Sequence, residues 1–267
     1  MPLIPLSYWD LAAAGLLLLV NGALSVAMAL RLERPLLLAA VRMVVQLSLV
    51  GLVLNQLFAL RSPWLTLGMA AVMVGFAGHE ILGRQDRTLS GGWTYGLGAG
   101  SMAFAASLVM LMALTTAIRP DPWYDPRYAI PMLGMVLGNT MSGVSLALNT
   151  LSNAAVRERA AIEARLALGS SRWEALRTQQ RQALRTGMMP IVNAMAATGV
   201  VSLPGMMTGQ ILGGVNPNEA VKYQILIMFL IAGATGLGVL LATFGAVHRL
   251  TDARDRLRLD RLNAYDR

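Results

Sequence analysis

Long apolar stretches follow one another along almost the whole chain. Five of the intervals between charged residues are at least 20 residues long, which is the length a helix needs to cross a hydrocarbon core about 30 Å thick. Two shorter apolar stretches complete the pattern; one contains Arg42, and the other is free of charge as far as Glu80. The pattern therefore predicts seven transmembrane helices, at residues 9–30, 36–60, 63–82, 93–118, 128–153, 188–212 and 222–247.

Composition favours a membrane protein over a soluble one. Charged residues make up 13% of the chain, whereas they make up about 25% of a soluble domain. The core helices of soluble proteins are also shorter, about 10–15 residues, and have one polar face. We expect an all-α, polytopic membrane protein, built as a single transmembrane domain over residues 1–267 with a cytoplasmic region at 157–187.

The basic residues predict the orientation of the helices in the membrane. Seventeen of the 22 fall in four segments on one side of a seven-helix arrangement, at 31–34, 84–87, 157–185 and 249–267. Because Lys and Arg are retained on the cytoplasmic side, we expect the N-terminus outside and the C-terminus inside. The net charge of +8 then reflects topology, and no nucleic-acid partner is expected. The charged tail, 251–267, is expected to form a solvated helix or a frayed end.

The longest polar segment, 157–187, has the sequence of two helices with a break between them. Strong helix formers fill its first part, Gly169 supplies a stop, and Ser171 with Glu174 has the spacing of a capping box. One interpretation is a solvated connection that only fixes orientation. The other is a helical elbow that docks on a cytoplasmic partner and transmits its motion to the adjoining membrane helices.

Four motifs resemble those of a known class of transporters. The segment 163–170, Glu-Ala-Arg-Leu-Ala-Leu-Gly-Ser, is similar to the Glu-Ala-Ala…Gly coupling motif of ABC-transporter permeases, with Arg165 in place of the second alanine. The segments 41–47, 131–139 and 201–209, the last reading Val-Ser-Leu-Pro-Gly-Met-Met-Thr-Gly, resemble the FetB-type permease family. That family includes a bacterial iron-export permease and plant aluminium-tolerance relatives.

The resemblance implies an ABC permease subunit in the bacterial inner membrane that exports iron or a related metal ion with a separate FetA-type ATPase. We expect a homodimer, because twofold pairing is the commonest closed assembly. The single lysine, Lys222, follows valine rather than glycine, so the chain has no P-loop. We therefore expect no enzyme activity and no cofactor on this chain. ATP and Mg would bind the partner, and the elbow would contact that partner through Glu163, Ala164, Leu168, Gly169 and Ser170.

Polar residues inside the predicted spans are candidates for a translocation pathway. These residues could instead have purely structural roles. A basic side chain within a span can extend to the lipid headgroups, a proline can kink a helix so that it packs, and Met often fills cores. In the fifth span, Ser145 and Asn153 extend a polar stripe about 120° wide. That stripe can instead hydrogen-bond between helices that Gly134, Gly138 and Gly143 bring close together. The candidate pathway residues are Arg42, Gln46, Asn139, Ser142, Asn149, Pro204, Met206 and Met207.

The substrate is the least determined part of this interpretation. No His, Asp or Glu cluster suited to iron lies in the predicted spans, so the metal ligands stay unknown, and the 17 methionines would suit Cu(I) better than Fe(II). The alternative is an ATP-independent secondary transporter or channel, which needs intramembrane carboxylates or a gated pore; Glu80 is the one candidate carboxylate. An intramembrane protease using Ser142 or Ser145 needs a histidine at the same depth, but His79 and His248 lie near cytoplasmic span ends.

Overall fold

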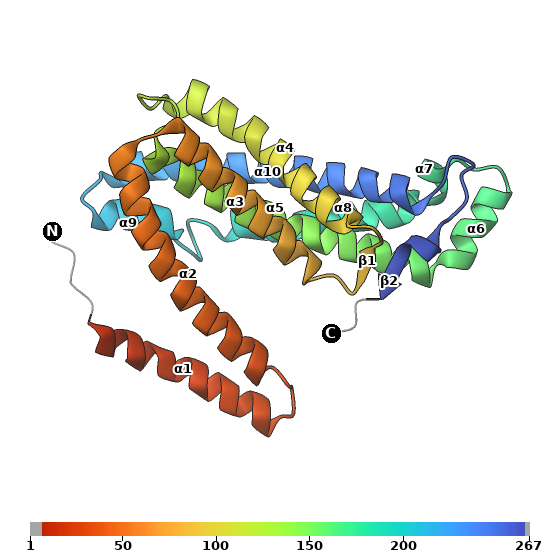
Figure 1. Cartoon of the computed structure of the whole chain (residues 1–267), viewed down its shortest axis with the longest axis horizontal. Helices are drawn as coiled ribbons and strands as arrows, with labels where there is room; N and C mark the ends of the chain where they lie inside the picture. The colour runs from red at the N-terminus through yellow and green to blue at the C-terminus, as the bar shows by residue number, and fades with distance from the viewer. Residues whose placement is uncertain (1–6, 265–267) are drawn as a thin grey trace.

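The chain folds as the all-α, polytopic protein that its sequence predicts. The structure is a computed structural model that describes residues 7–264. Within this range six helices are long and apolar enough to cross a membrane (Figure 1). They are α1 (Tyr8–Ala27), α2 (Glu33–Leu60), α3 (Pro63–Leu82), α4 (Trp93–Met112) with the π-helical turn Ala113–Ile118 that continues it, α5 (Pro126–Arg157) and α10 (Pro217–Leu250).

Helix α5 forms the centre of the bundle. It packs against α3, α4, α10 and α8 (Arg177–Ala197). Where α5 crosses α8, Gly143 faces Gly187, and a Cβ atom at position 143 would lie 2.8 Å from the Gly187 carbonyl oxygen. The expectation of close packing is therefore confirmed at Gly143. At Gly138 no atom lies within 4 Å of the position that a Cβ would occupy, so that glycine is not needed for packing.

One end of the bundle, called here the elbow end, carries the short elements. Helices α6 (Arg159–Ala167) and α7 (Arg172–Ala175) lie there between α5 and α8 (Figure 1). A two-stranded antiparallel sheet lies at the same end and pairs β1 (Arg87–Leu89) with β2 (Leu262–Ala264). This sheet joins the α3–α4 connection to the C-terminal tail, two segments far apart in the sequence.

The C-terminal tail is a strap over the elbow end, and the expectation of a solvated helix or frayed end is wrong for residues 251–264. Leu257, Leu259 and Leu262 pack against the bundle core. A helix would place Leu257 and Leu259 about 200° apart, on opposite faces, so the extended form buries them together. The strap contains the 3₁₀ turn Leu259–Arg261 ahead of β2. Positions 265–267 of the predicted tail lie outside the described residues.

The span predicted at 188–212 is a discontinuous helix. Helix α8 ends just before Thr198, which has a ψ of 131°, and Gly199 follows with a left-handed φ of +94°. The helix resumes as α9 (Gly205–Leu212), whose N-cap is Pro204. The break begins at Thr198 and Gly199, ahead of Pro204, because glycine adopts a positive φ without strain. Helix α9 lies at the end of the bundle opposite the elbow end (Figure 1), so α8 and α9 together complete a seventh passage.

Helices α1 and α2 form a hairpin that diverges from the bundle (Figure 1). Ser25 is the buried residue of α1, and its hydroxyl donates to Glu33 Oε2 at 2.9 Å where α2 begins. The backbone N–H of Leu32 donates to the same hydroxyl oxygen at 2.8 Å. Leu57 is the buried residue of α2. Almost the whole apolar surface of this hairpin is therefore left to lipid or to another protein.

Candidate functional site

The predicted elbow is present as two short helices joined by a sharp turn. The turn centres on Gly169, whose φ is +91°, and no atom would contact a Cβ there, so its backbone conformation is what calls for glycine. Helix α7 begins with the predicted capping box: Glu174 Oε2 accepts from the Ser171 backbone N–H at 2.9 Å and from the Ser171 hydroxyl at 2.9 Å. These bonds hold the pKa of Glu174 below its usual range.

The elbow is fixed to the ends of α5 and α8. Ile162 of α6 is fully buried, and Arg165 Nη1 donates to the carbonyl oxygen of Ala175 at 3.1 Å, which joins α6 to α7. Gln179 Nε2 on α8 donates to Glu158 Oε2 at 2.6 Å. That bond, followed by the one from Arg157, lowers the pKa of Glu158. These contacts connect the elbow to the ends of two long helices.

The tip of the elbow is exposed and partly apolar. Leu168 is 87% exposed, which makes it the most exposed large hydrophobic side chain of the elbow. Ala164 and Gly169 are exposed as well, while Glu163 forms an ion pair with Arg159 at 2.8 Å. The predicted partner-contact residues thus lie around one protruding turn, with Ser170 half-buried at its base.

Two contacts that sequence reasoning missed hold the far side of the elbow. The Trp173 ring of α7 lies 5.2 Å from the Phe244 ring of α10. Arg172 Nε donates to Asp255 Oδ1 of the strap at 2.6 Å. The residues in each contact lie more than 70 residues apart in the sequence. The alternation of Asp and Arg in the tail was the one sequence signal for an ion pair there, and it did not indicate which residues would pair.

Arg42 and Glu80 form an ion pair that links α2 to α3. Sequence reasoning singled out each residue without pairing them. Both side chains are partly exposed. Gln46, one turn further along α2, is exposed. An arginine within a span is therefore neutralised by a carboxylate from the neighbouring helix, as is usual for charges inside membranes.

The half of the α5 polar stripe nearest the elbow is used for packing. Gln85 Nε2 donates to the Ser145 carbonyl oxygen at 3.1 Å. Asn149 Oδ1 accepts from the Asp86 backbone N–H at 3.0 Å, and the side-chain amides of Asn149 and Asn153 each donate to Asp86 Oδ2 at 3.0 Å. These bonds attach the α3–α4 connection to α5.

The other half of the stripe is left open. Asn139 is exposed and Ser142 is half-buried. Their side chains donate to carbonyl oxygens of their own helix, Met135 O at 2.8 Å and Gly138 O at 3.1 Å. The amide oxygen of Asn139 and the lone pairs of Ser142 remain available on a face of α5 that the described residues leave partly exposed.

The methionine pair Met206 and Met207 follows the helix break. Met206 and Met207 are half-buried in the first turn of α9, and Met206 packs against the bundle core. Among residues 7–264 no group of three or more His, Asp or Glu side chains gathers in a form that could hold a metal ion. These contacts agree with a packing role for Met206. They do not identify any metal ligand among the described residues.

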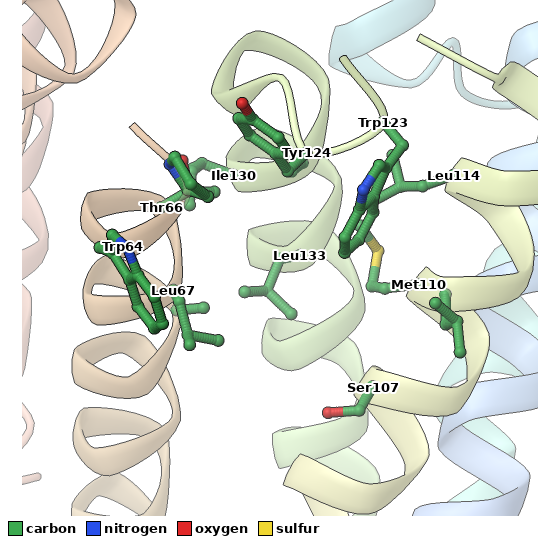
Figure 2. A pocket seen from close by; sticks show the side chains of 14 residues that line it. Trp64, Thr66, Leu67, Ser107, Met110, Leu114, Trp123, Tyr124, Ile130 and Leu133 are labelled. Carbon is green, nitrogen blue, oxygen red and sulfur yellow. The ribbon is translucent and has the colours of Figure 1, made fainter. Parts of the chain in front are cut away.

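The ends of α3, α4 and α5 away from the elbow end line an open apolar cavity of about 510 Å³ (Figure 2). Trp64 and Trp123 lie on its two sides, and Leu133 of α5 points into it. Ser107 and Thr66 are among its few polar groups. A lining of this kind suits an acyl chain and offers too few oxygen donors to hold a cation.

The chain's similarity to known proteins identifies its family. The model of an uncharacterised protein family, UPF0014, matches residues 8–251. The chain belongs to the UPF0014 family. This confirms the resemblance to FetB-type permeases, because an Escherichia coli relative is named probable iron export permease protein FetB. That relative is 29% identical to this UPF0014 chain over 93% of the chain and 93% of its own length.

Two further relatives span most of this UPF0014 chain. A UPF0014 membrane protein of Synechocystis is 39% identical over 80% of this chain and 82% of its own. Protein ALUMINUM SENSITIVE 3 of Arabidopsis thaliana is 31% identical over 87% of this chain and 83% of its own. No solved structure matches the chain. Together with its apolar helices, these relatives make the UPF0014 chain a multi-pass membrane protein.

Proposed function

We propose that this UPF0014 protein is the permease subunit of an ABC transporter that exports iron or a related metal ion, driven by a separate ATPase. The observation that carries the proposal is the elbow, an exposed helix–turn–helix tip joined rigidly to α5 and α8. The iron substrate is taken from the name of the Escherichia coli relative. A protruding tip on two long helices is suited to converting the movement of a docked partner into a rigid-body shift.

The proposed orientation places the elbow end in the cytoplasm of a bacterial cell, beneath the inner membrane. Basic residues concentrate in the segments that meet at the elbow end, at 84–87, 157–185 and 249–261. Retention of Lys and Arg on the cytoplasmic side favours that arrangement. In this orientation the tip around Leu168 faces the compartment that holds ATP.

The ATPase partner supplies the energy in this proposal. The sequence has one lysine, preceded by valine, so it offers no P-loop for the phosphates of ATP. ATP and Mg would bind the partner, whose groove would receive Leu168 with Ala164 and Gly169 around it. Burial of an exposed leucine by the partner would contribute about 1.5–3 kcal/mol to docking through the hydrophobic effect.

The translocation pathway is proposed to form between two copies of the chain. The centre of a single bundle is closely packed around α5, while Asn139 and Ser142 lie on its open face. A polar side chain at membrane depth is stable beside protein or water rather than lipid. Two copies facing each other would supply amide and hydroxyl oxygens from both α5 helices, with Arg42, Gln46 and the start of α9 towards the edges.

Cysteine cross-linking tests the dimer directly, because the chain contains no cysteine. Asn139→Cys and Ser142→Cys, expressed in membranes and treated with a short bismaleimide, are expected to give a covalent dimer on a denaturing gel. Phe229→Cys on α10, where the native side chain is 67% exposed, is the matched control and is expected to remain monomeric. Equal cross-linking at all three positions, or none at 139 and 142, would contradict a dimer across the open face of α5.

The function itself is tested by reconstitution. The chain is purified in mild detergent with the P-loop ATPase that it retains, and both are inserted into vesicles with the ATPase outside. ATP is expected to drive Fe(II) into these inside-out vesicles, and omission of the chain is expected to abolish both metal-stimulated hydrolysis and uptake. ATP hydrolysis that proceeds identically without the chain would rule the proposal out.

The alternative, a secondary transporter or channel, predicts metal movement under an imposed proton gradient with no ATPase present. Its proton site would be an intramembrane carboxylate. Glu80, the candidate from the sequence, is ion-paired with Arg42, which favours a structural role for that carboxylate. The same vesicles without ATP therefore decide between the two mechanisms.

A further inference from the structure

A second cavity, of about 430 Å³, lies at the elbow end beneath the strap. Its walls come from the start of α4, from α7, from the last turn of α10 and from the strap, so it is separate from the elbow tip and from the α5 stripe. Its lining is rich in cationic groups. The lining residues are Trp93, Arg172, His248, Arg249, Thr251, Asp252, Ala253 and Arg261.

Two of the charged groups in this cavity already have full sets of partners. Arg172 donates from Nε to Asp255, from Nη2 to the Asp252 carbonyl oxygen at 2.9 Å, and lies 3.4 Å from His248 Nδ1. The Asp252 carboxylate accepts from the backbone N–H groups of Arg254 and Arg256 and from the Arg256 side chain. The bonds from Arg256 lower the pKa of Asp252 to about 2.

The other two arginines have donors without a carboxylate. Arg249 Nε is buried and has no hydrogen-bond partner among the described residues, and its guanidinium carbon lies 4.9 Å from the centre of the Trp93 ring. Arg261 donates from Nη1 to the carbonyl oxygens of Arg249 and Thr251, at 2.8 and 3.2 Å. Neither arginine has a carboxylate within ion-pair distance in the described part of the chain. The positive charge of these two arginines is therefore not compensated by carboxylates of the described residues, which favours an anionic ligand in the cavity.

We propose that this cavity binds a phosphate group through Arg249 and Arg261. The planar guanidinium of arginine matches the oxygens of phosphate and binds them with two parallel hydrogen bonds. The span predicted at 222–247 ends two residues before Arg249, and the span predicted at 93–118 begins at Trp93, which puts the cavity at the depth of the lipid headgroups. That depth favours the phosphate of an anionic lipid over a soluble phosphate.

A bound phosphate would strengthen the connection between strap and elbow. Arg249 belongs to α10 and Arg261 to the strap, and Arg172 of α7 lines the same cavity. One phosphate bridging the first two would therefore hold the strap against the helix on which the elbow rests. This inference depends on the geometry of the elbow end and not on what the protein transports.

Native mass spectrometry of the detergent-purified chain tests the proposal with three proteins and three ligands. The ligands are short-chain phosphatidic acid, short-chain phosphatidylcholine and inorganic phosphate. The proteins are the wild type, Arg249→Gln, and Arg254→Gln as a control that removes one positive charge from the strap outside the cavity. Arg249 donates no side-chain hydrogen bond to residues 7–264, so its replacement is expected to leave the fold intact, as a thermal melt without ligand will verify.

Phosphatidic acid is expected to bind the wild type and Arg254→Gln equally, and Arg249→Gln about tenfold more weakly because a charge-assisted hydrogen bond is lost. Displacement by inorganic phosphate would assign the site to a free phosphate, and resistance to displacement would assign it to a lipid headgroup. If Arg249→Gln melts early, Arg261→Gln takes its place. Equal binding of phosphatidic acid to the cavity variant and to Arg254→Gln would overturn the proposal.

Discussion

Replacing Leu168 with aspartate is expected to uncouple the ATPase from the membrane helices while leaving the protein folded. Leu168 is 87% exposed at the tip of the elbow, so its loss removes no internal packing, and surface changes of this kind alter stability by about 0.5 kcal/mol or less. In the proposed interface the same side chain is buried by the partner. Because burying a leucine side chain contributes about 1.5–3 kcal/mol, its loss is expected to weaken docking by about tenfold or more.

The measurement is subunit-dependent ATP hydrolysis together with metal uptake in inside-out vesicles. Both are expected to fall at least about tenfold in Leu168→Asp, with an unchanged melting temperature. Asn263→Asp is the matched control, because it adds the same charge at the elbow end on an exposed residue of β2. Normal coupling in Leu168→Asp would show that the tip does not dock on the ATPase, even if the chain proved to be a transporter.

The second large effect is expected from Gly143→Ala, which should destabilise the bundle. The new Cβ would lie 2.8 Å from the Gly187 carbonyl oxygen and 2.8 Å from Thr235 Cγ2. Because one of these neighbours is backbone, α5 and α8 must move apart to admit the methyl group. Overpacking of this kind costs about 1–3 kcal/mol, which should appear as a clear fall in melting temperature in detergent.

Gly138→Ala in the same helix supplies the comparison. No atom lies within 4 Å of a Cβ at that position, so the change should leave packing untouched. Alanine is a better helix former than glycine by about 1 kcal/mol, and the variant is therefore expected to be as stable as the wild type or slightly more stable. If both alanine variants melted at the same temperature, the close crossing of α5 and α8 at Gly143 would be wrong.

Signals confined to one segment were read correctly from the sequence. Helix α3 has the bounds of the stretch predicted at 63–82, and the stretch predicted at 93–118 has those of α4 with its π-helical turn. The capping box at Ser171 and the stop at Gly169 are formed as expected. Each depends on hydrophobic run length or on hydrogen bonds between residues three apart, which the local sequence specifies by itself.

Features that join distant segments could not be predicted. The tail alternates Asp and Arg and resembles a solvated end, but Leu257, Leu259 and Leu262 bury themselves against the bundle and β2 pairs with β1. The polar stripe of α5 was read as one unit, although Asp86 occupies its elbow half and leaves Asn139 open. In both cases, β2 with β1 and Asp86 with the asparagines of α5, the residues in contact lie more than 60 residues apart in the sequence.

The sequence by itself determined that the chain lies in a membrane, how long its helices are and where its elbow turns. Those properties follow from the transfer of apolar side chains out of water and from backbone preferences, both of which act within about 20 residues. The tertiary structure alone decided that Gly187 faces Gly143, that Arg42 pairs with Glu80, and that the strap closes a cationic cavity around Arg249. Such contacts depend on how whole helices pack in three dimensions. Many residues could serve as the partner of a given side chain, and the sequence does not show which of them the fold brings close.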